Sequence, residues 1–490
     1  MQALLGVDIG TSAAKAALFS LQGCLLSSAR VPHVLSSPLP GWAEQDPDDW
    51  RNGVNAAIRQ VLESTQDVEV AAVGLSGQCP GHLLVDEDGD PIGSAIIWRD
   101  IRAQAESEWI CKHISPEDAA AWTGSSSIGS PTLPPARLLW LKAHRPEDWE
   151  NCAYVLEPKD FIALHLTGRA ATDANTAYCL IHPETSTYDP EFMRILGVEI
   201  DKLPVVLQPT QFIGEITHQA ASQTGLRPGT PVVAGTIDAY CDSIAGGALQ
   251  PGQAVDVAGT SEIVSLGTDG LVQSSGVFLA SVVKDGQFIC GPSQAGGDTL
   301  HWLAKVFYPG QSFPDALPQI EAEAGSVPPG CEGLVFVPYL HGARAPLWNT
   351  NIRGSFLRVD AGHQRAHFSR AVYEGVAFEV RHILEACELA YGKQAESITL
   401  CGGGSASQLW NKIKAGVLER DLYPSAVRDT ACLGAAILAA AAAGFYPNVR
   451  LASQEMVRRL PQVEPEPGSF EIYSDNYRVY QSYHKFFASE

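Results

Sequence analysis

Val7-Asp8-Ile9-Gly10-Thr11-Ser12, near the start of the chain, has a close counterpart in Val255-Asp256-Val257-Ala258-Gly259-Thr260-Ser261, past its middle. Each stretch is an apolar β-strand that runs into a Gly-Thr-Ser turn. Such a turn directs backbone N–H groups and two hydroxyls beyond the end of the strand, where they suit a phosphate. One such turn is weak evidence, but a matched pair predicts two related domains that hold one polyphosphate.

The length of the chain agrees with two domains. A chain of 490 residues exceeds what one hydrophobic core usually organises, and domains of about 200–250 residues are expected. We place the boundary near Leu249, which predicts an N-terminal domain over residues 1–248 and a C-terminal domain over 253–445. Residues 446–490 then form an extension whose last helix is expected to dock on the body. That helix repeats aromatic residues at helical spacing: Tyr477, Tyr480, Tyr483 and Phe487.

Composition and charge narrow the classes of function. The formal net charge of −22 opposes nucleic-acid phosphates and anionic membranes, so neither is an expected partner. A small anion such as a nucleotide remains compatible, because backbone dipoles and a metal ion can outweigh the global field locally. The 11 cysteines include no CxxC pair, and the longest apolar run, residues 431–444, is shorter than the roughly 20 residues of a membrane span. Reduced thiols and a cytoplasmic location are expected.

The two halves show a similar order of α and β patterns. In the first half the expected elements are three strands and a helix: residues 4–9, 15–19, 24–31 and 46–64. In the second half they are two strands, a helix and a further strand: residues 254–257, 263–266, 366–390 and 397–401. The pattern predicts an α/β fold in which the second half repeats the first.

Asp8 precedes the first Gly-Thr-Ser turn, and Lys15 begins the return strand. A carboxylate in this place suits Mg²⁺, which keeps most of its water and takes one or two protein carboxylates beside phosphate oxygens. The Lys15 ammonium is then within reach of a phosphate oxygen. The plainer alternative for Asp8 is a carboxylate that caps the turn, and the presence of a second turn favours the metal and phosphate role.

Gly402-Gly403-Gly404 follows an apolar strand and precedes a helix. Glycines let the backbone approach a flat or anionic ligand closely, although a tight strand-to-helix turn explains the cluster when it is taken alone. The cluster does not match the GxGxxG dinucleotide fingerprint, which argues against a nicotinamide dehydrogenase.

Two further groups are candidates for contact with an acceptor molecule. Asp238 follows a strand and begins a short helix, so its carboxylate is placed to accept the proton of an alcohol during phosphoryl transfer. It is equally well placed to cap that helix, and Asp242, one turn later, is a weaker candidate. Trp98-Arg99-Asp100 joins an aromatic face to charged groups, as sugar sites do; the alternative is a buried Trp beside a surface ion pair.

Taken together, these residues resemble the FGGY carbohydrate kinases, and among them the xylulokinase-like branch. Eight stretches in the family's order carry the resemblance: LLGVDIGTSAAKAALF at 4–19, GWAEQDPDDW at 41–50, GLSGQ at 74–78, IIWRDIRA at 96–103, EPKDFIALHLTGRAATD at 157–173, VPYLHGARAPLWNTNIRGSF at 337–356, AVYEGVAFEV at 371–380 and LCGGGSASQLWNKIKAGVL at 400–418. They span nearly the whole chain, and their number and order make the resemblance specific.

The resemblance implies a fold and a reaction. The fold is α/β, with two RNase H-like domains of the actin/hexokinase/Hsp70 superfamily that flank a deep cleft. The sugar is expected on the N-terminal side, and ATP with Mg²⁺ mainly on the C-terminal side. The reaction is ATP-dependent phosphorylation of a primary hydroxyl of a small sugar, with D-xylulose as the best single candidate. A homodimer is a further expectation from the family.

The resemblance also implies roles for single residues. The catalytic base is expected to be Asp238, and the metal-side carboxylate to be Asp8. The expected sugar-binding residues are Gln78, Trp98, Asp100 and Asp238. The expected ATP-binding residues are Thr11, Ser12, Lys15, Gly259, Thr260, Ser261, Gly297, Gly402, Gly403, Gly404 and Asn411.

Three positions depart from the family's pattern. Cys79-Pro80-Gly81 stands where xylulokinases usually carry Met-His-Gly, whose histidine contacts the sugar, so that contact is missing unless His82 replaces it. Arg137 stands where Lys is usual and Arg358 where Gly is common, both away from the expected chemistry. The first departure leaves D-ribulose, L-ribulose, another pentulose, glycerol and erythritol open as acceptors. A nucleotide-dependent sugar sensor of the same fold is the alternative from another class, and the presence of both Asp238 and Trp98 favours the kinase.

Overall fold

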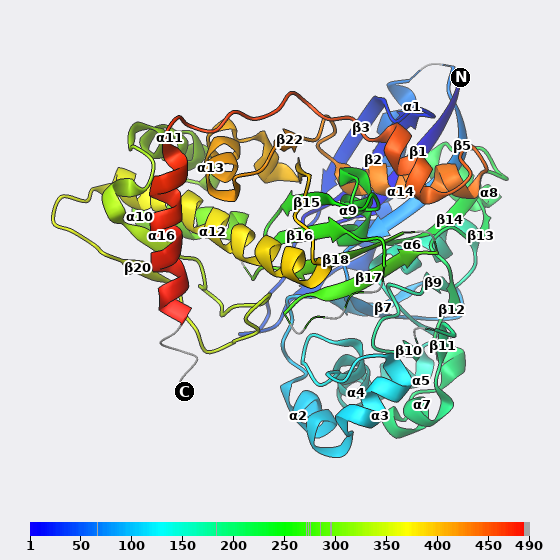
Figure 1. Cartoon of the computed structure of the whole chain (residues 1–490). Coiled ribbons are helices and arrows are strands. Elements are labelled where there is room, and N and C mark those ends of the chain that lie inside the picture. The colour runs from blue at the N-terminus through cyan, green and yellow to red at the C-terminus, as the bar shows by residue number, and fades with distance from the viewer. Residues whose placement is uncertain are drawn as a thin grey trace. The chain divides into compact units, whose positions relative to one another are not determined.

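In a computed structural model the chain divides into two compact units (Figure 1). Unit 1 comprises Met1–Cys241 and Ala431–Met456, and unit 2 comprises Asp242–Thr430 and Val457–Glu490. This division falls inside a helix rather than after Leu249, and it places residues 431–456 with the N-terminal part of the chain. The structure describes residues 1–65, 67–182, 184–270, 272, 274, 276–284, 286–294 and 296–484.

Unit 1 is built on a six-stranded sheet. Its strands are, in sheet order, β13 (Phe212–Glu215), β14 (Pro231–Ile237), β5 (Glu69–Gly77), β1 (Gln2–Ile9), β2 (Ala13–Ser20) and β3 (Leu25–Pro32). β1, β2 and β3 form the predicted antiparallel meander, and β5 and β14 continue the sheet parallel to β1. β1 and β2 are buried almost throughout, as strands are when helices cover both faces of a sheet.

Two helices cover opposite faces of this sheet. α1 (Pro47–Glu63) begins after Asp46, whose side chain accepts the backbone N–H of Asp48, and its apolar side packs on the face to which Val7 points. α14 (Thr430–Ala442) packs on the other face. A Cβ atom on Gly6 would lie 1.9 Å from the carbonyl oxygen of Cys432, and one on Gly74 would lie 1.9 Å from that of Ala435. The backbone of α14 thus touches β1 and β5 directly, which is why contacts assign it to unit 1.

The remaining elements of unit 1 extend from this sheet. A second sheet has the order β4 (Glu44–Gln45), β7 (Pro91–Ile96), β6 (His82–Val85) and β8 (Tyr154–Leu156). The short strands pair as β12 (Val205–Leu207) with β9 (Ala171–Asp173) and β10 (Ile181–His182) with β11 (Thr187–Tyr188). The helices are α2 (Gln104–His113), α3 (Pro116–Thr123), α4 (Pro134–His144), α5 (Pro146–Asn151), α6 (Pro158–Thr167), α7 (Pro190–Leu196), α8 (His218–Thr224), α15 (Val449–Met456) and a 3-10 turn at Ile200–Lys202. α9 (Asp238–Gly246) starts in unit 1 and continues into unit 2.

Unit 2 repeats the plan of the first sheet. Its strands are, in sheet order, β17 (Phe278–Val283), β18 (Gly286–Pro292), β16 (Glu262–Gly267), β15 (Gln253–Ala258), β21 (Ser397–Cys401) and β22 (Leu422–Pro424). β15, β16 and β18 are antiparallel neighbours, and β17, which precedes β18 in the chain, pairs with it at the edge of the sheet. β21 and β22 run parallel to β15, as β5 and β14 run parallel to β1. A small sheet pairs β19 (Val335–Val337) with β20 (Ser355–Leu357). The predicted repetition of elements is confirmed.

Helices complete unit 2. They are α10 (Gly297–Phe307), α11 (Phe313–Ser326), α12 (Arg365–Tyr391), α13 (Gln408–Leu418), α16 (Ser469–His484) and 3-10 turns at Cys331–Gly333 and Gly403–Ala406. α16 crosses α12 (Figure 1), and its Tyr473, Tyr477 and Tyr480 are buried in the core beside α12. The terminal helix is therefore docked; Phe487 lies outside the described residues. Within the part of the chain that the structure describes, no helix has the length and apolar character required to cross a membrane.

Candidate active site

The carboxyl ends of three parallel strands meet at one edge of the sheet in unit 1. Ile9 of β1 is in register with Gly77 of β5, and Gly77 is in register with Ile237 of β14. Gly10, Gln78 and Asp238 are the residues that follow these strand ends. The fold thus gathers the first Gly-Thr-Ser turn, a proposed sugar-binding amide and a proposed base along one edge, which is where open α/β sheets bind ligands.

Asp8 is buried just before that edge, with 1% of its surface exposed. One carboxylate oxygen lies 3.1 Å from the Lys15 Nζ atom, and the other accepts a hydrogen bond from the Ser76 hydroxyl at 2.9 Å. Thr11 and Ser12 remain accessible at the turn, and Arg30 donates to the Ser12 hydroxyl at 2.8 Å. The cation nearest to Asp8 is therefore Lys15, the predicted phosphate ligand. Lys15 partly neutralises the Asp8 carboxylate, which lies beside an accessible turn.

A chain of polar side chains joins this turn to the expected sugar residues. The Gln78 amide nitrogen donates to the Gln45 side chain at 2.7 Å, and Gln45 donates to the Thr11 carbonyl at 2.7 Å. Trp98 donates from its indole nitrogen to the Thr11 hydroxyl at 2.9 Å. The buried Oε1 atom of Gln78 has no hydrogen-bond partner among the described residues. Gln78 and Trp98 thus lie together with Thr11, and the Oε1 atom of Gln78 is a free hydrogen-bond acceptor.

Asp238 is half-buried at the start of α9, where its side chain accepts the backbone N–H of Ala239 at 2.7 Å. The strand before it is held by a buried network, since Thr236 donates to Asp173 at 2.9 Å and Lys159 lies 3.0 Å from the same carboxylate. Although burial works against it, the carboxylates of Asp160 and Asp173 raise the pKa of Lys159, which stays charged. This network of Thr236, Asp173 and Lys159 holds the end of β14, which directly precedes Asp238 in the chain.

Asp100, which was expected to contact the sugar, differs from Asp8 in the burial of its ion-pair partner: the Arg102 side chain is 3% exposed, and that of Lys15 is 21% exposed. Asp100 is 1% exposed, and its carboxylate accepts hydrogen bonds from the Ala43 backbone N–H at 2.6 Å and from the Arg102 guanidinium at 2.6–2.9 Å. Arg102 also lies 3.5 Å above the ring of Trp42. Both oxygens are therefore used within the protein, so this side chain supports the turn that carries Trp98.

The loop that follows β5 contains the departure from the family's pattern at Cys79 and Pro80, and the residues around it are buried. The Cys79-Pro80 peptide bond is cis, and His82 cannot replace the missing histidine, because it is 4% exposed and lies 3.5 Å from Glu157 inside the fold. Burial and the nearby Arg137 hold the pKa of His82 well below its usual value, so the ring is neutral at pH 7. Arg137, which was expected away from the chemistry, contacts this loop directly: its guanidinium donates to the Pro80 carbonyl at 2.9 Å.

Arg358 marks a backbone requirement rather than a site. Its φ angle is 58°, in the left-handed region where glycine carries no steric penalty. Arg358 thus occupies a position where glycine is common, and its backbone has the left-handed conformation that glycine adopts without strain.

In unit 2 the backbone at the start of α10 is hydrogen-bonded to the second Gly-Thr-Ser turn. The backbone N–H of Gly297 donates to the Gly259 carbonyl at 2.9 Å, and those of Gly296 and Asp298 donate to the Thr260 carbonyl at 2.9 and 3.1 Å. A Cβ atom on Gly297 would lie 2.7 Å from the Gly259 oxygen, so only glycine permits this contact. Gly259 and Thr260 themselves are exposed. Gly297 therefore lies beside the second Gly-Thr-Ser turn.

The glycine cluster lies against the same turn. A Cβ atom on Gly402 would lie 2.6 Å from the Ala258 oxygen, and one on Gly404 would lie 2.7 Å from the Ala258 side chain, whereas one on Gly403 would meet nothing within 4 Å. Gly402 and Gly404 thus serve packing, and Gly403 faces open space. Asn411 is 6% exposed and donates to the Ser405 carbonyl at 2.8 Å, so its amide braces the loop.

Asp256, the acid that precedes the second turn, is fully buried. Lys414 of α13 lies 2.6 Å from its carboxylate and 3.1 Å from that of Glu262. Burial and the adjacent Asp256 raise the pKa of Glu262 well above its usual range, while the Lys414 ammonium opposes this shift. Asp256 is therefore part of an internal cluster and does not repeat the position of Asp8 beside an open turn.

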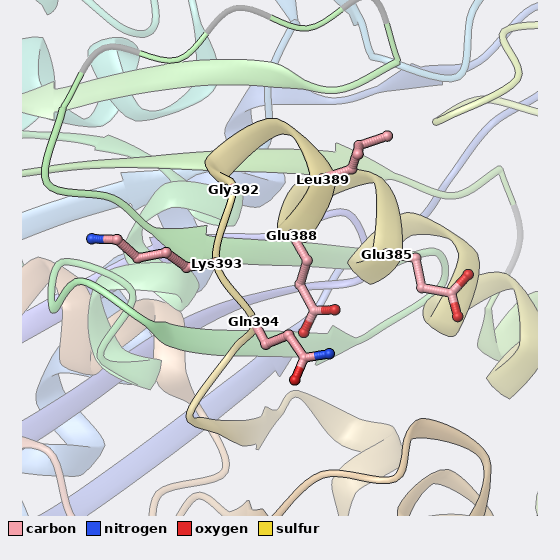
Figure 2. A pocket seen from close by; sticks show the side chains of 6 residues that line it. All are labelled: Glu385, Glu388, Leu389, Gly392, Lys393 and Gln394. Atoms are coloured by element: carbon pink, nitrogen blue, oxygen red, sulfur yellow. The ribbon is translucent and has the colours of Figure 1, made fainter.

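A surface depression of about 350 Å³ lies elsewhere in unit 2, at the end of α12 (Figure 2). Its charged residues already have partners: Glu385 accepts from Arg381, Glu388 accepts from Arg420, and Lys393 donates to Asp269. We assign no chemistry to it. Among the described residues, no three His, Cys, Asp or Glu side chains form a group that could hold a metal ion, which leaves Asp8 as the carboxylate to consider.

Gln45 and Asp173 are site residues that the sequence did not single out. Both lie within stretches that carry the resemblance, at 41–50 and 157–173, but a lone glutamine or aspartate gives no local signal of its partner. Their roles emerge only from the distances to Gln78, Thr11 and Thr236.

Comparisons with known proteins agree with this arrangement. The N-terminal domain model of the FGGY family of carbohydrate kinases matches residues 3–244, and the C-terminal domain model matches residues 254–443. The chain is 28% identical to the xylulose kinase of Bacillus subtilis (strain 168), over 98% of this chain and 96% of that one. It is 30% identical to the L-xylulose/3-keto-L-gulonate kinase of Escherichia coli (strain K12), over 97% and 95%.

A solved structure shows the same fold. The crystal structure of gluconate kinase from Lactobacillus acidophilus superposes with a TM-score of 0.86 at 25% identity, covering 100% of this chain and 99% of that one. Two sheets of one plan, each with a glycine turn at the end of its central strand, together with family models that match both halves, lead to one conclusion: the chain belongs to the FGGY family of carbohydrate kinases.

Proposed function

We propose that the protein catalyses the ATP-dependent phosphorylation of a primary hydroxyl group of a small sugar, with D-xylulose to D-xylulose 5-phosphate as the first candidate. The observation that carries the proposal is the shared strand edge of unit 1, where Gly10, Gln78 and Asp238 follow β1, β5 and β14. Phosphoryl transfer requires positioning, charge neutralisation and a group that accepts the alcohol proton, and this edge offers each of them.

Asp238 is the proposed base. Its carboxylate takes the proton of the acceptor hydroxyl, whose oxygen forms a bond to the γ-phosphorus of ATP while the bond between that phosphorus and the β–γ bridging oxygen breaks. The products are the sugar phosphate, ADP and a proton that passes from Asp238 to solvent. The half-buried position of Asp238, on a strand end held by Asp173, supports this role.

The phosphate groups are proposed to contact Thr11, Ser12 and Lys15 of unit 1 and the turn at Gly259, Thr260 and Ser261 of unit 2. Gly297, Gly402, Gly403, Gly404 and Asn411 are proposed to form or brace the nucleotide site. Asp8 fits Mg²⁺, because a single carboxylate beside an open turn is what Mg²⁺ takes when phosphate oxygens and water complete its shell. Bound there, Mg²⁺ would neutralise charge on the phosphates.

The identity of the sugar depends on the loop after β5. Cys79 and Pro80 offer no imidazole, and His82 is buried against Glu157. A second candidate acceptor is therefore another pentulose, such as D-ribulose or L-ribulose, or a short polyol, such as glycerol or erythritol. The relatives' names point to more than one acceptor as well, because they include xylulose, 3-keto-L-gulonate and gluconate kinases.

ADP release across a panel of pentuloses, hexuloses, sugar acids and polyols tests the reaction. The Asp238→Asn variant should lose about a thousandfold in kcat on the best acceptor while its KM changes little, because only the proton acceptor is removed. Asp242→Asn, one turn later on α9, is the matched control and should keep most turnover. Loss in Asp242→Asn with activity retained in Asp238→Asn would reverse the assignment, and no acceptor above the acceptor-free rate would refute the proposed sugar class.

A double variant tests the choice of sugar. Replacing Cys79 by Met and Pro80 by His restores the usual residues of this loop. If the loop sets the preference, the ratio of kcat/KM for D-xylulose to that for the best acceptor should rise about tenfold or more. An unchanged ratio would remove the loop from the explanation.

A further inference from the structure

A buried guanidinium lies beside the loop that follows β5. Arg137, in the first turn of α4, has no exposed surface, although taking a charged side chain out of water is costly. Its hydrogen bonds go to main-chain carbonyls: Nη1 donates to Pro80 at 2.9 Å, and Nη2 donates to Ile97 at 2.7 Å and to Asp100 at 3.2 Å. A buried charge directed at backbone oxygens serves to hold backbone segments in place.

The two segments it joins carry the proposed acceptor contacts. Pro80 lies two residues after Gln78, and Ile97 and Asp100 bracket Trp98. The guanidinium is planar, and its nitrogens point in fixed directions, so donating to Pro80 and Ile97 at once fixes the separation of the two segments. Arg137 therefore determines how the Gln78 amide and the Trp98 ring lie relative to each other.

The other side of the loop is held as well. The carboxyl group of Glu157 accepts the backbone N–H of Gly81 at 2.5 Å, so the Pro80 carbonyl and the next N–H group are both fixed by buried side chains. Burial, together with the carboxylates of Glu157, Asp238 and Asp173, raises the pKa of Cys79 well above its usual value. The neutral Cys79 thiol is directed at the Thr176 carbonyl, 3.9 Å away, and its loop is anchored at the next two residues.

We propose that Arg137 is a positioning residue that sets the geometry of the acceptor end of unit 1 and thereby the choice of sugar. The inference rests on the proposed function, which places the acceptor beside Gln78, Trp98 and Asp238. Two of the positions that depart from the family's pattern, Arg137 and the Cys79-Pro80 loop, are in direct contact. A lysine at this position has one donor atom and does not bridge Pro80 and Ile97 in the same fixed geometry.

The test compares two arginine-to-lysine variants of the full chain. Arg370 is the matched control, since it is equally buried but lies in unit 2, bonded to Glu374 and Glu466. In Arg137→Lys, kcat/KM for the best sugar should fall about 10- to 100-fold, because small misplacements at a reacting centre have effects of this size. The ratio of kcat/KM for the best sugar to that for the other sugars should also fall. The KM for ATP should stay within about twofold of wild type. Arg370→Lys should lower the melting temperature without changing the order of sugars.

Two further measurements distinguish a loss of loop positioning from a general loss of stability. Backbone hydrogen exchange, followed by mass spectrometry, should rise at residues 78–83 and 97–102 in Arg137→Lys but not in Arg370→Lys. In Arg137→Ala, added methylguanidinium should restore part of the sugar turnover. The inference would be overturned by unchanged hydrogen exchange in these segments, or by equal losses of kcat/KM for the sugar and for ATP. If the wild type phosphorylates no sugar of the panel, the proposed acceptor class fails, while exchange still decides whether Arg137 holds the two segments.

Discussion

At the scale of single residues, the surroundings of a side chain decide what it can do. Asp8 and Asp256 precede similar turns, yet the first lies beside a partly exposed lysine and the second is buried with Lys414 and Glu262. Removing one member of a buried charge cluster leaves the others uncompensated, so Asp256 is tied to a structural role. Of the two, Asp8 is therefore the one that we propose to face a metal-bound phosphate.

Glu379 of α12 gives a prediction about pH. Its side chain is 1% exposed, both oxygens lack partners among the described residues, and burial raises its pKa well above the usual range. The folded state then holds a proton that the unfolded state releases above about pH 4.3, so this group lowers stability as pH rises from there toward its folded pKa. Glu379→Gln should therefore raise the melting temperature more at pH 8 than at pH 5.5.

The control for this prediction is Glu471, which is exposed on α16. Glu471→Gln should shift the melting temperature little and equally at both pH values. A gain in Glu379→Gln that is the same at pH 5.5 and pH 8 would contradict the expected protonation difference.

Gly403 gives a prediction about the nucleotide. A Cβ atom there would meet nothing within 4 Å, so Gly403→Ala should leave the melting temperature unchanged. If ATP approaches this backbone as proposed, the added methyl group should raise the KM for ATP by about tenfold while the KM for sugar stays constant. Gly270→Ala, also in open space, is the control and should change neither constant. An unaltered KM for ATP in Gly403→Ala would place the nucleotide elsewhere.

At the scale of elements, the contact of α14 with the first sheet depends on glycine. Gly6 and Gly74 lie within β1 and β5, where their missing side chains let the helix backbone approach, and Gly434 of α14 does the same toward the Cys241 carbonyl. Glycine within a strand weakens the strand unless another backbone comes close, and here it does. The Ala-rich composition of α14 is suited to such a close approach.

Gly74→Ala tests this contact. The added Cβ atom would lie 1.9 Å from the Ala435 carbonyl, so α14 must move away from the sheet, and the free energy of unfolding should fall by about 3 kcal/mol. Urea unfolding measures the change, with Gly270→Ala as the variant that should be neutral. Equal denaturation midpoints for Gly74→Ala and wild type would show that the helix is not held this closely.

Sequence patterns predicted the elements well but not their long-range partners. The meander, α1, α12 and β21 follow from local hydrophobic periodicity, and the glycine turns mark strand ends wherever they occur. The contacts of Arg137 were missed because one arginine in an apolar helix does not reveal which carbonyls it meets. The membership of α14 was missed for the same reason, although the glycines inside β1 and β5 were a signal that another backbone lies near them.

At the scale of the whole molecule, neither unit is a continuous piece of chain. Unit 1 needs residues 431–456 to cover one face of its sheet. A chain of residues 1–252 should therefore fail to fold cooperatively, because the face formed around Gly6 and Gly74 would be open to water. The same chain joined by a Gly/Ser linker to residues 427–456 should show a cooperative thermal transition by circular dichroism. A sharp transition in residues 1–252 alone would contradict this expectation.

The late arrival of α14 has a consequence for synthesis in the cell. The sheet of unit 1 is complete when residue 241 is made, but its covering helix begins at residue 430. At translation rates of about 5–20 residues per second, the interval lasts on the order of 10–40 s. During that time the sheet face around Gly6 and Gly74 lacks its covering helix on the nascent chain, and we expect it to bind chaperones at the ribosome exit.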